Sequence, residues 1–207
     1  MRPMQLTFLD LAADPEPWTA AGFTVEGGGV TLGAVRVELR GAQAGRGLLG
    51  WSFAAAPEGP LDGLPEPAVA PAPEPGGAHP NGITAVDHVV AFSPDLERTV
   101  TALEAAGMDL RRRREGPTGG GSARQAFFRV GDAILEVVEH PAQAREAGDP
   151  DAPARLWGLA LLAPDIDATA DAAGELIGDV KDAIQPGRRI ATFRREAALG
   201  AAVAVLQ

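Results

Sequence analysis

Short runs of alternating hydrophobic and polar residues follow one another along most of the chain, and their order is clearest in the middle of the sequence. The β-branched run at residues 83–93 predicts a strand. Asp95, which follows a proline, then opens a segment in which Leu96, Val100 and Leu103 recur at helical spacing. Three further strand-like runs follow, separated by glycine-containing turns, at residues 108–115, 123–130 and 133–139. The predicted order of this block is βαβββ.

The same plan recurs further along the chain. Asp165 stands 70 residues after Asp95, again behind a proline, and follows a strand-like run at residues 156–163. A repeat of this length is half a domain rather than a solenoid repeat. We therefore expect residues 83–207 to form one domain. It consists of two βαβββ units, at residues 83–140 and 154–207.

The N-terminal part of the sequence predicts a shortened copy of this unit. Strand-like runs at residues 6–11 and 35–39 flank a turn of three consecutive glycines. The alternating apolar residues Val35, Val37 and Leu39 require a covering layer. A reduced βαβββ-like unit is therefore expected over residues 1–56.

A proline-rich segment separates the N-terminal part from the rest. Eight prolines between Pro57 and Pro80 exclude a helix interior or a central strand, so residues 57–82 are expected to be a linker. Residues 50–53 align loosely with residues 158–161, which leaves open a degenerate fourth unit. The predicted fold class is α+β, with tandem βαβββ units that form an open, concave mixed sheet of half-barrel type.

Composition narrows the choice of partners. The chain carries 18 basic and 28 acidic residues, a net charge of −10, which repels nucleic acid and anionic membranes. It has no cysteine, so any metal must be held by nitrogen and oxygen. No apolar stretch approaches the roughly 20 residues of a membrane span, and no phosphate-loop pattern indicates a nucleotide cofactor. We expect a cytoplasmic protein whose partner is a small molecule.

Several motifs resemble the vicinal oxygen chelate superfamily, which contains glyoxalase I, bleomycin resistance proteins and extradiol dioxygenases. They are Asp87-His88-Val89-Val90 on the first strand, the apolar run around Glu136 on the last strand, and the Pro-Asp helix starts. The segment at residues 79–82, just ahead of a strand, is similar to glyoxalase-like members. The resemblance covers residues 83–140 well, the last unit by shape, and the N-terminal part weakly.

This resemblance implies a divalent ion on the concave face of the sheet. Each unit of the family typically offers a histidine on its first strand and a glutamate on its last strand. Here these positions are His88 and Glu136, the two expected metal ligands, and Glu136 is also the expected catalytic group that moves a proton. The last unit has Gly158 and Val205 at the matching positions, so the site for zinc, nickel, manganese or iron is expected to be partly degenerate.

Other interpretations remain open for each of these residues. His88 is also explained as a packed strand histidine hydrogen-bonded near Asp87, and Glu136 as the partner of an arginine. Glu38, which matches Glu136 in the N-terminal copy, is a candidate substrate-binding residue or an ion-paired residue on a solvated face. His79 is expected to be exposed in a turn, and Trp157 to pack in the core.

Two classes of function are consistent with these features. The first is a metal-dependent enzyme of glyoxalase-like type, with lyase, isomerase or dioxygenase chemistry. The second is a metal-free protein that binds or sequesters a small molecule, as bleomycin resistance proteins do. A homodimer is left open.

Overall fold

The computed structural model describes residues 4–118, 121–139, 149 and 151–207, in which most elements are strands. The N-terminal strands are β1 (Leu6–Leu11), β2 (Gly29–Leu32), β3 (Val35–Leu39), β4 (Leu48–Phe53) and β5 (Ala68–Val69). The later strands are β6 (Ala85–Ser93), β7 (Asp109–Thr118), β8 (Gly121–Val130), β9 (Ala133–Glu139), β10 (Arg155–Leu162), β11 (Lys181–Asp182), β12 (Arg189–Thr192) and β13 (Ala202–Leu206). The α-helices are α1 (Pro15–Ala20), α2 (Leu96–Ala105) and α4 (Ile166–Ala173).

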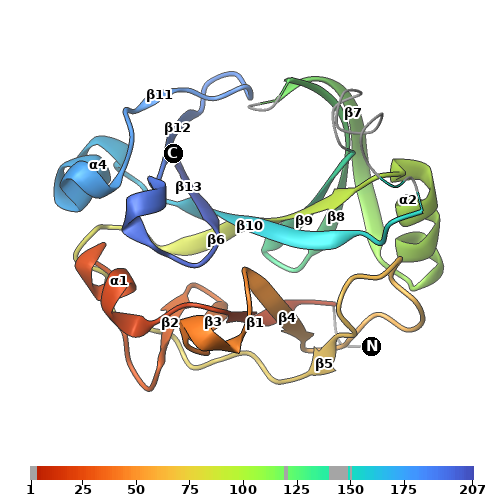
Figure 1. Ribbon diagram of the computed structural model, residues 1–207, viewed down its shortest axis with the longest axis horizontal. Helices are drawn as coiled ribbons and strands as arrows, with labels where there is room; N and C mark the ends of the chain where they lie inside the picture. Colours follow the sequence, from red (N-terminus) through yellow and green to blue (C-terminus); the bar gives the residue numbers. More distant parts are fainter. Residues whose placement is uncertain (1–3, 119–120, 140–148, 150) are drawn as a thin grey trace.

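The strands form two mixed sheets. The smaller sheet has five strands in the order β2-β3-β1-β4-β5, and the larger has eight in the order β11-β12-β13-β10-β6-β9-β8-β7. The larger sheet curls into an open half-barrel above the smaller one, with α1 and α4 at one side and α2 at the other (Figure 1). The predicted α+β class, the concave mixed sheet and the reduced N-terminal copy are confirmed.

The repeated helix starts follow from the same local chemistry. The side chain of Asp95 accepts a hydrogen bond from the backbone N–H of Arg98 at 3.1 Å, and Asp165 accepts one from Ala168 at 3.0 Å. Each aspartate thereby satisfies one of the backbone donors that a helix leaves free at its first turn. None of the helices in the described part of the chain has the length and hydrophobicity to span a bilayer.

One continuous apolar core joins the two sheets. The inward faces of the small sheet, including Val35, Val37 and Leu39, and the convex face of the large sheet bury their side chains in the same cluster. A buried hydrogen bond from the Trp18 indole Nε1 to the carbonyl of Leu199, at 3.3 Å, also joins the N-terminal and C-terminal parts. The N-terminal copy is therefore covered on its apolar face, as its alternation predicts.

A β-bulge recurs at the same place in the first strand of the two large-sheet units. His88 pairs with Ala160 and Val86 with Leu161, which leaves Asp87 as the extra residue of β6. Trp157 is the corresponding extra residue of β10, and it stands 70 positions after Asp87. A bulge releases one side chain from the strict alternation of faces along a strand. Position and backbone geometry are thus repeated, while the side chain at the bulge differs.

The small sheet contains the same irregularity. In the antiparallel pairing of β1 with β4, Thr7 and Leu49 are the extra residues. The pairing of β4 with β5 is parallel, as is that of β10 with β13. Thus β4 and β5 correspond to the first and last strands of a unit. Residues 54–67 between them, all of them described, contain no helix or strand.

We predict that the two sheets unfold together, because their core is shared. Replacing Leu9, which is fully buried on β1, by alanine should lower the free energy of unfolding by about 2–5 kcal/mol in a single transition. Urea unfolding followed by far-UV circular dichroism and tryptophan fluorescence measures this. Val69→Ala, at a position that is 72% exposed, should change little. Two separate transitions, with only one affected by Leu9→Ala, would contradict the prediction.

Candidate functional site

Three polar side chains from neighbouring strands meet on the concave face of the large sheet. His88 lies on β6, Glu136 on β9 and Gln125 on β8. The imidazole Nε2 of His88 lies 3.1 Å from Oε2 of Glu136. The amide Nε2 of Gln125 donates a hydrogen bond to the other carboxylate oxygen of Glu136. The carboxylate therefore contacts both neighbours at once, in the region where the resemblance predicted a site.

The bulge in β6 positions His88 through the residue before it. Because Asp87 is the extra residue, its carboxylate reaches the ring of its own neighbour, and His88 Nδ1 lies 2.7 Å from Asp87 Oδ2. Arg188, which directly precedes β12, donates from Nη2 to Asp87 Oδ1 at 3.0 Å. The imidazole is thus held on both ring nitrogens, and its carboxylate partner is itself held by a guanidinium.

These contacts shift two pKa values in opposite directions. Burial favours neutral His88, but the hydrogen bonds to Asp87 and Glu136 outweigh it and raise the pKa of His88 from 6.5 to about 9. Burial disfavours the charged form of Asp87, yet hydrogen bonds from His88 and Arg188 hold its pKa below the usual value of 3.8. At neutral pH His88 is therefore an imidazolium that contacts the ionised carboxylate of Asp87.

Gln125 belongs to a segment that carries the family resemblance, but the sequence did not predict it as a site residue. Its side chain is buried, and its Oε1 is a buried polar atom without a hydrogen-bond partner among the described residues. A buried amide oxygen without a partner is costly, so the position favours an additional donor or a cation. One feature of the sequence could have indicated a role for it: Gln125 is a polar residue between the apolar Ala123 and Phe127 on one face of a strand.

The other half of the concave face supplies no equivalent ligands. The register of β6 with β10 places Gly158 where His88 stands in the first unit. In the parallel ladders, Glu136 pairs with Val90 and Ala204 with Ala160, so Ala204 is the residue that matches Glu136. The expectation of Val205 at this position was wrong by one residue, and Val205 is fully buried in the core. No three His, Asp or Glu side chains in the described part of the chain are grouped to hold a metal ion.

Glu38 lies apart from this cluster. It is on β3 of the small sheet, where its carboxylate pairs with Nε of Arg36 at 2.7 Å. Arg40 on the same strand pairs with Asp10 instead. The structure brings His88 and Glu136 together and leaves Glu38 in a different sheet.

Two other expectations require correction. His79 is buried rather than exposed: its Nδ1 accepts a hydrogen bond from the backbone N–H of Thr24 at 3.1 Å, and its Nε2 lies 3.0 Å from the carbonyl of Thr31. These contacts tie the linker to the small sheet. Trp157 is 40% exposed rather than packed in the core, because it is the bulged residue of β10.

Comparison with solved structures identifies the fold. A triple mutant of 4-hydroxymandelate synthase from Streptomyces coelicolor, an enzyme of the vicinal oxygen chelate superfamily, superposes with a TM-score of 0.67 at 17% identity. The match covers the whole of this chain and 93% of that chain. The chain has the vicinal oxygen chelate fold.

Two further members of the vicinal oxygen chelate superfamily match part of the chain. Methylmalonyl-CoA epimerase from Mycobacterium tuberculosis has a TM-score of 0.48 at 18% identity, over 60% of this chain and 88% of that chain. A variant of the Streptomyces coelicolor epimerase in complex with 2-nitronate-propionyl-CoA has a TM-score of 0.49 at 20% identity. This match covers 60% of the present chain and 96% of the epimerase chain. No family model matches the sequence, and no curated protein does.

We predict a pH dependence of stability from the raised pKa of His88. Because folding raises this pKa from 6.5 to about 9, the group stabilises the fold fully below pH 6.5, and its contribution is lost as the pH rises through 9. In the presence of a chelator, the free energy of unfolding should fall over this window by on the order of 3 kcal/mol more than in His88→Asn. Urea unfolding at pH 6, 7.5 and 9 measures it. The same pH dependence in both proteins would show that His88 is not the group responsible.

Proposed function

We propose that the protein binds and transforms a small molecule on the concave face, with a divalent cation held by His88, Glu136 and Gln125. The observation that carries this proposal is the meeting of a ring nitrogen, a carboxylate and a side-chain amide on three adjacent strands. The oxygen of that amide is buried and has no hydrogen-bond partner among the described residues. A nitrogen and oxygen donor set of this kind suits zinc, nickel, manganese and iron(II).

The contacts of His88 support this role. A histidine that ligates a metal usually donates its other ring N–H to a carboxylate, which fixes the tautomer and the orientation of the ring. The Nδ1–H of His88 donates to Oδ2 of Asp87, and Nε2 of His88 faces Glu136. The 3.1 Å between His88 Nε2 and Glu136 Oε2 also agrees with the separation of about 3 Å between two neighbouring ligands of one ion. A rotated Gln125 amide would present its oxygen to the same place.

The chemistry of the site follows from its residues. The cation would supply polarisation of two neighbouring oxygen atoms of a substrate. Glu136 would move a proton, because its carboxylate lies on the concave face of the sheet, where it accepts hydrogen bonds from two neighbouring side chains. In the last unit, Gly158 and Ala204 have no side-chain atoms that could bind a metal, and they are small. The half of the concave face that they line therefore has room for the substrate. The reaction would be of lyase, isomerase or dioxygenase type.

A metal-free binding protein is the second candidate, and one observation favours it. At neutral pH the His88 imidazolium and the Glu136 carboxylate satisfy each other at 3.1 Å without an ion. The same concave face would then sequester a small molecule and carry out no reaction on it.

Titration with zinc, nickel, manganese and iron(II) tests the proposal. We expect calorimetry to detect binding that is easily reversed by a chelator, and that is lost in His88→Ala, Glu136→Ala and Gln125→Leu. Asp87→Asn should weaken it about tenfold, because the histidine loses its orienting partner. Glu38→Ala removes the matching carboxylate of the small sheet and serves as the control, without effect.

The pH dependence of metal binding provides an independent measurement. A metal must displace the proton from His88 Nε2, so affinity should rise by about tenfold per unit from pH 7 towards 9. Binding that survives all three substitutions would place a metal elsewhere. The absence of binding to any of the four ions would favour the metal-free candidate.

A further inference from the structure

The arginines of β7 lie on two different faces of the large sheet. Arg112 pairs across the ladder with Phe127, and Arg114 pairs with Gln125. Residues directly opposite each other in antiparallel strands share a face. Because Gln125 contacts Glu136 on the concave face, Arg112 and Arg114 lie on the concave face too. Arg113 between them lies on the opposite face.

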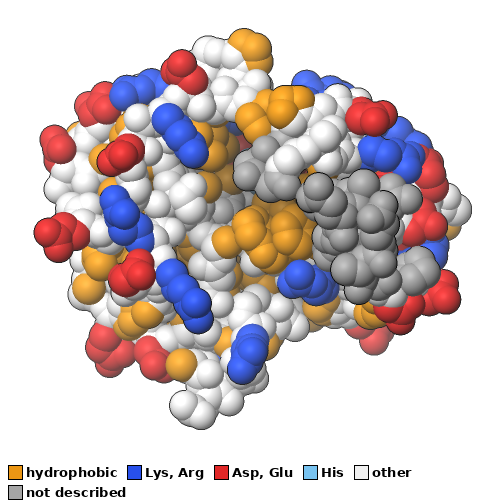
Figure 2. Space-filling view, turned by 45° about the horizontal axis from the view of Figure 1, so that its top comes forward, with side chains coloured by type: hydrophobic (Ala, Val, Ile, Leu, Met, Phe, Trp, Pro, Cys, Tyr) orange, Lys and Arg blue, Asp and Glu red, His pale blue; other side chains and the backbone are white. Residues whose placement is uncertain are grey.

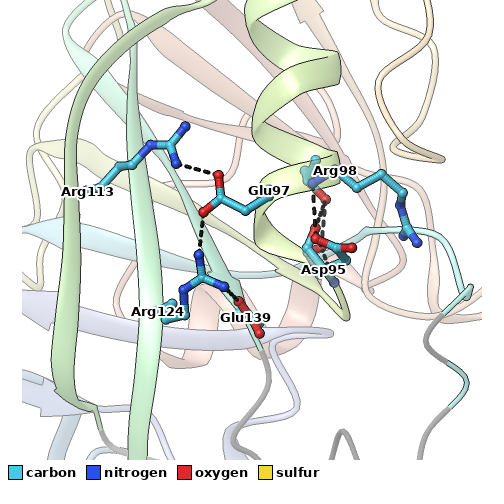
Figure 3. A network of polar contacts seen from close by, with 8 residues as sticks. Asp95, Glu97, Arg98, Arg113, Arg124 and Glu139 are labelled. Carbon is cyan, nitrogen blue, oxygen red and sulfur yellow. Dashed lines mark hydrogen bonds and ion pairs between the residues drawn. The ribbon is translucent and has the colours of Figure 1, made fainter.

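The arginines on that opposite face are neutralised by carboxylates. Arg113 donates to Glu97 of α2 at 2.5 Å, and Arg124 of β8 pairs with Glu139 at 2.9 Å and with Glu97 (Figure 3). The close-up shows the four side chains gathered beside the helix. On this side of the sheet, the positive charge of β7 and β8 is matched by nearby acidic residues.

The arginines on the concave face have a different environment. Within the described ranges, Arg112, Arg114 and Arg155 form no ion pair with Asp or Glu. The guanidinium carbon of Arg112 lies 5.0 Å from the centre of the Phe127 ring, and that of Arg155 lies 5.5 Å from the centre of the Phe92 ring. In a chain with a net charge of −10, these three arginines leave positive charge on the concave face that no described carboxylate pairs with.

Between these cations the concave face is apolar. Val90, Ala123 and Val138 form a hydrophobic cluster separate from the main core, with Phe92 packed against it. The indole of Trp157 stacks on the Phe92 ring, with centres 4.7 Å apart and planes inclined by 28°, and it remains 40% exposed. Figure 2 shows hydrophobic side chains in the middle of this hollowed face, with Lys and Arg side chains around it.

We infer that the ligand of the concave face is a small organic anion with a flat apolar body. The body lies on the floor formed by Val90, Val138 and the Phe92–Trp157 stack, and the anionic group is bound by Arg112 and Arg114. This inference rests on the proposed use of the concave face. It adds the charge and shape of the ligand, which the His88–Glu136–Gln125 cluster does not determine.

The physical basis is electrostatic selection on an apolar surface. A guanidinium binds carboxylate and phosphate oxygens with paired, charge-assisted hydrogen bonds. A neutral analogue of the same shape makes the same apolar contacts, but it forms no charge-assisted hydrogen bonds with the arginines, which stay hydrated. Arg114 stands directly across from Gln125, so the anionic group is bound next to the polar cluster rather than at a distant rim.

Calorimetry with 2-naphthoate and its neutral analogue 2-naphthamide tests the inference. EDTA is present, so that a carboxylate–metal contact cannot produce the preference. We expect the acid to bind about tenfold more tightly than the amide, as a charge-assisted contact implies. Arg112→Gln and Arg114→Gln should each reduce that preference and leave the affinity for the amide unchanged. Trp157→Ala should weaken both probes equally.

Arg113→Gln is the matched control. It removes one positive charge from the same strand, on the other face, and should leave the preference intact. A preference lost equally in Arg113→Gln would mean that only net charge matters, and would overturn the inference. Equal binding of the two probes to the wild-type protein would also overturn it, while leaving the concave face as a small-molecule site.

Two further outcomes separate this inference from the proposed function. Metal binding at His88 and Glu136 without binding of either naphthyl probe would overturn the ligand class alone. The absence of both metal and probe binding would contradict both proposals. A third probe, 2-naphthyl phosphate, distinguishes the source of the anion: tighter binding than 2-naphthoate would indicate a phosphate ester, and weaker binding a carboxylate. Tighter or weaker binding of the phosphate supports the inference, provided that the binding of the anionic probe is weakened by Arg112→Gln and Arg114→Gln.

Discussion

The apolar layer between the two sheets is the constraint on which the rest of the structure depends. The convex face of the large sheet is buried against the small sheet and the helices, in one cluster that includes Leu9, Val37, Val89 and Leu161. Burial of these side chains stabilises the fold because it removes apolar surface from contact with water. It also decides where chemistry takes place, because the concave face remains as the open surface of the large sheet.

Local patterns in the sequence predicted much of this fold. The strand at 133–139, the helix starts at Asp95 and Asp165, and the repeat of 70 residues are all recovered, because they depend on alternation and capping within a few residues. The match of Glu136 to Val205 was wrong by one position. Inter-strand register is a property of pairing between distant segments, and a shift of one residue moves a side chain to the other face.

The candidate site was predicted only in part for the same reason. His88 and Glu136 were identified from their positions on the first and last strands of a unit. Gln125 and Arg188 were not, because their roles arise from contacts made by folding; Arg188 reaches Asp87 across 101 residues of sequence. The sequence likewise shows four consecutive arginines, but only the ladder of β7 with β8 separates those paired with acids from those facing the hollow.

The recurring bulge has a consequence for how such a protein diversifies. Four first strands carry an extra residue at one equivalent position, filled by Thr7, Leu49, Asp87 and Trp157. The backbone irregularity recurs together with the ladder that surrounds it. The side chain there is then free to change, because the pairing on either side does not depend on its identity. In this chain Asp87 at one bulge orients a histidine, and Trp157 at another stacks on Phe92, so one repeated backbone feature serves two different kinds of chemistry.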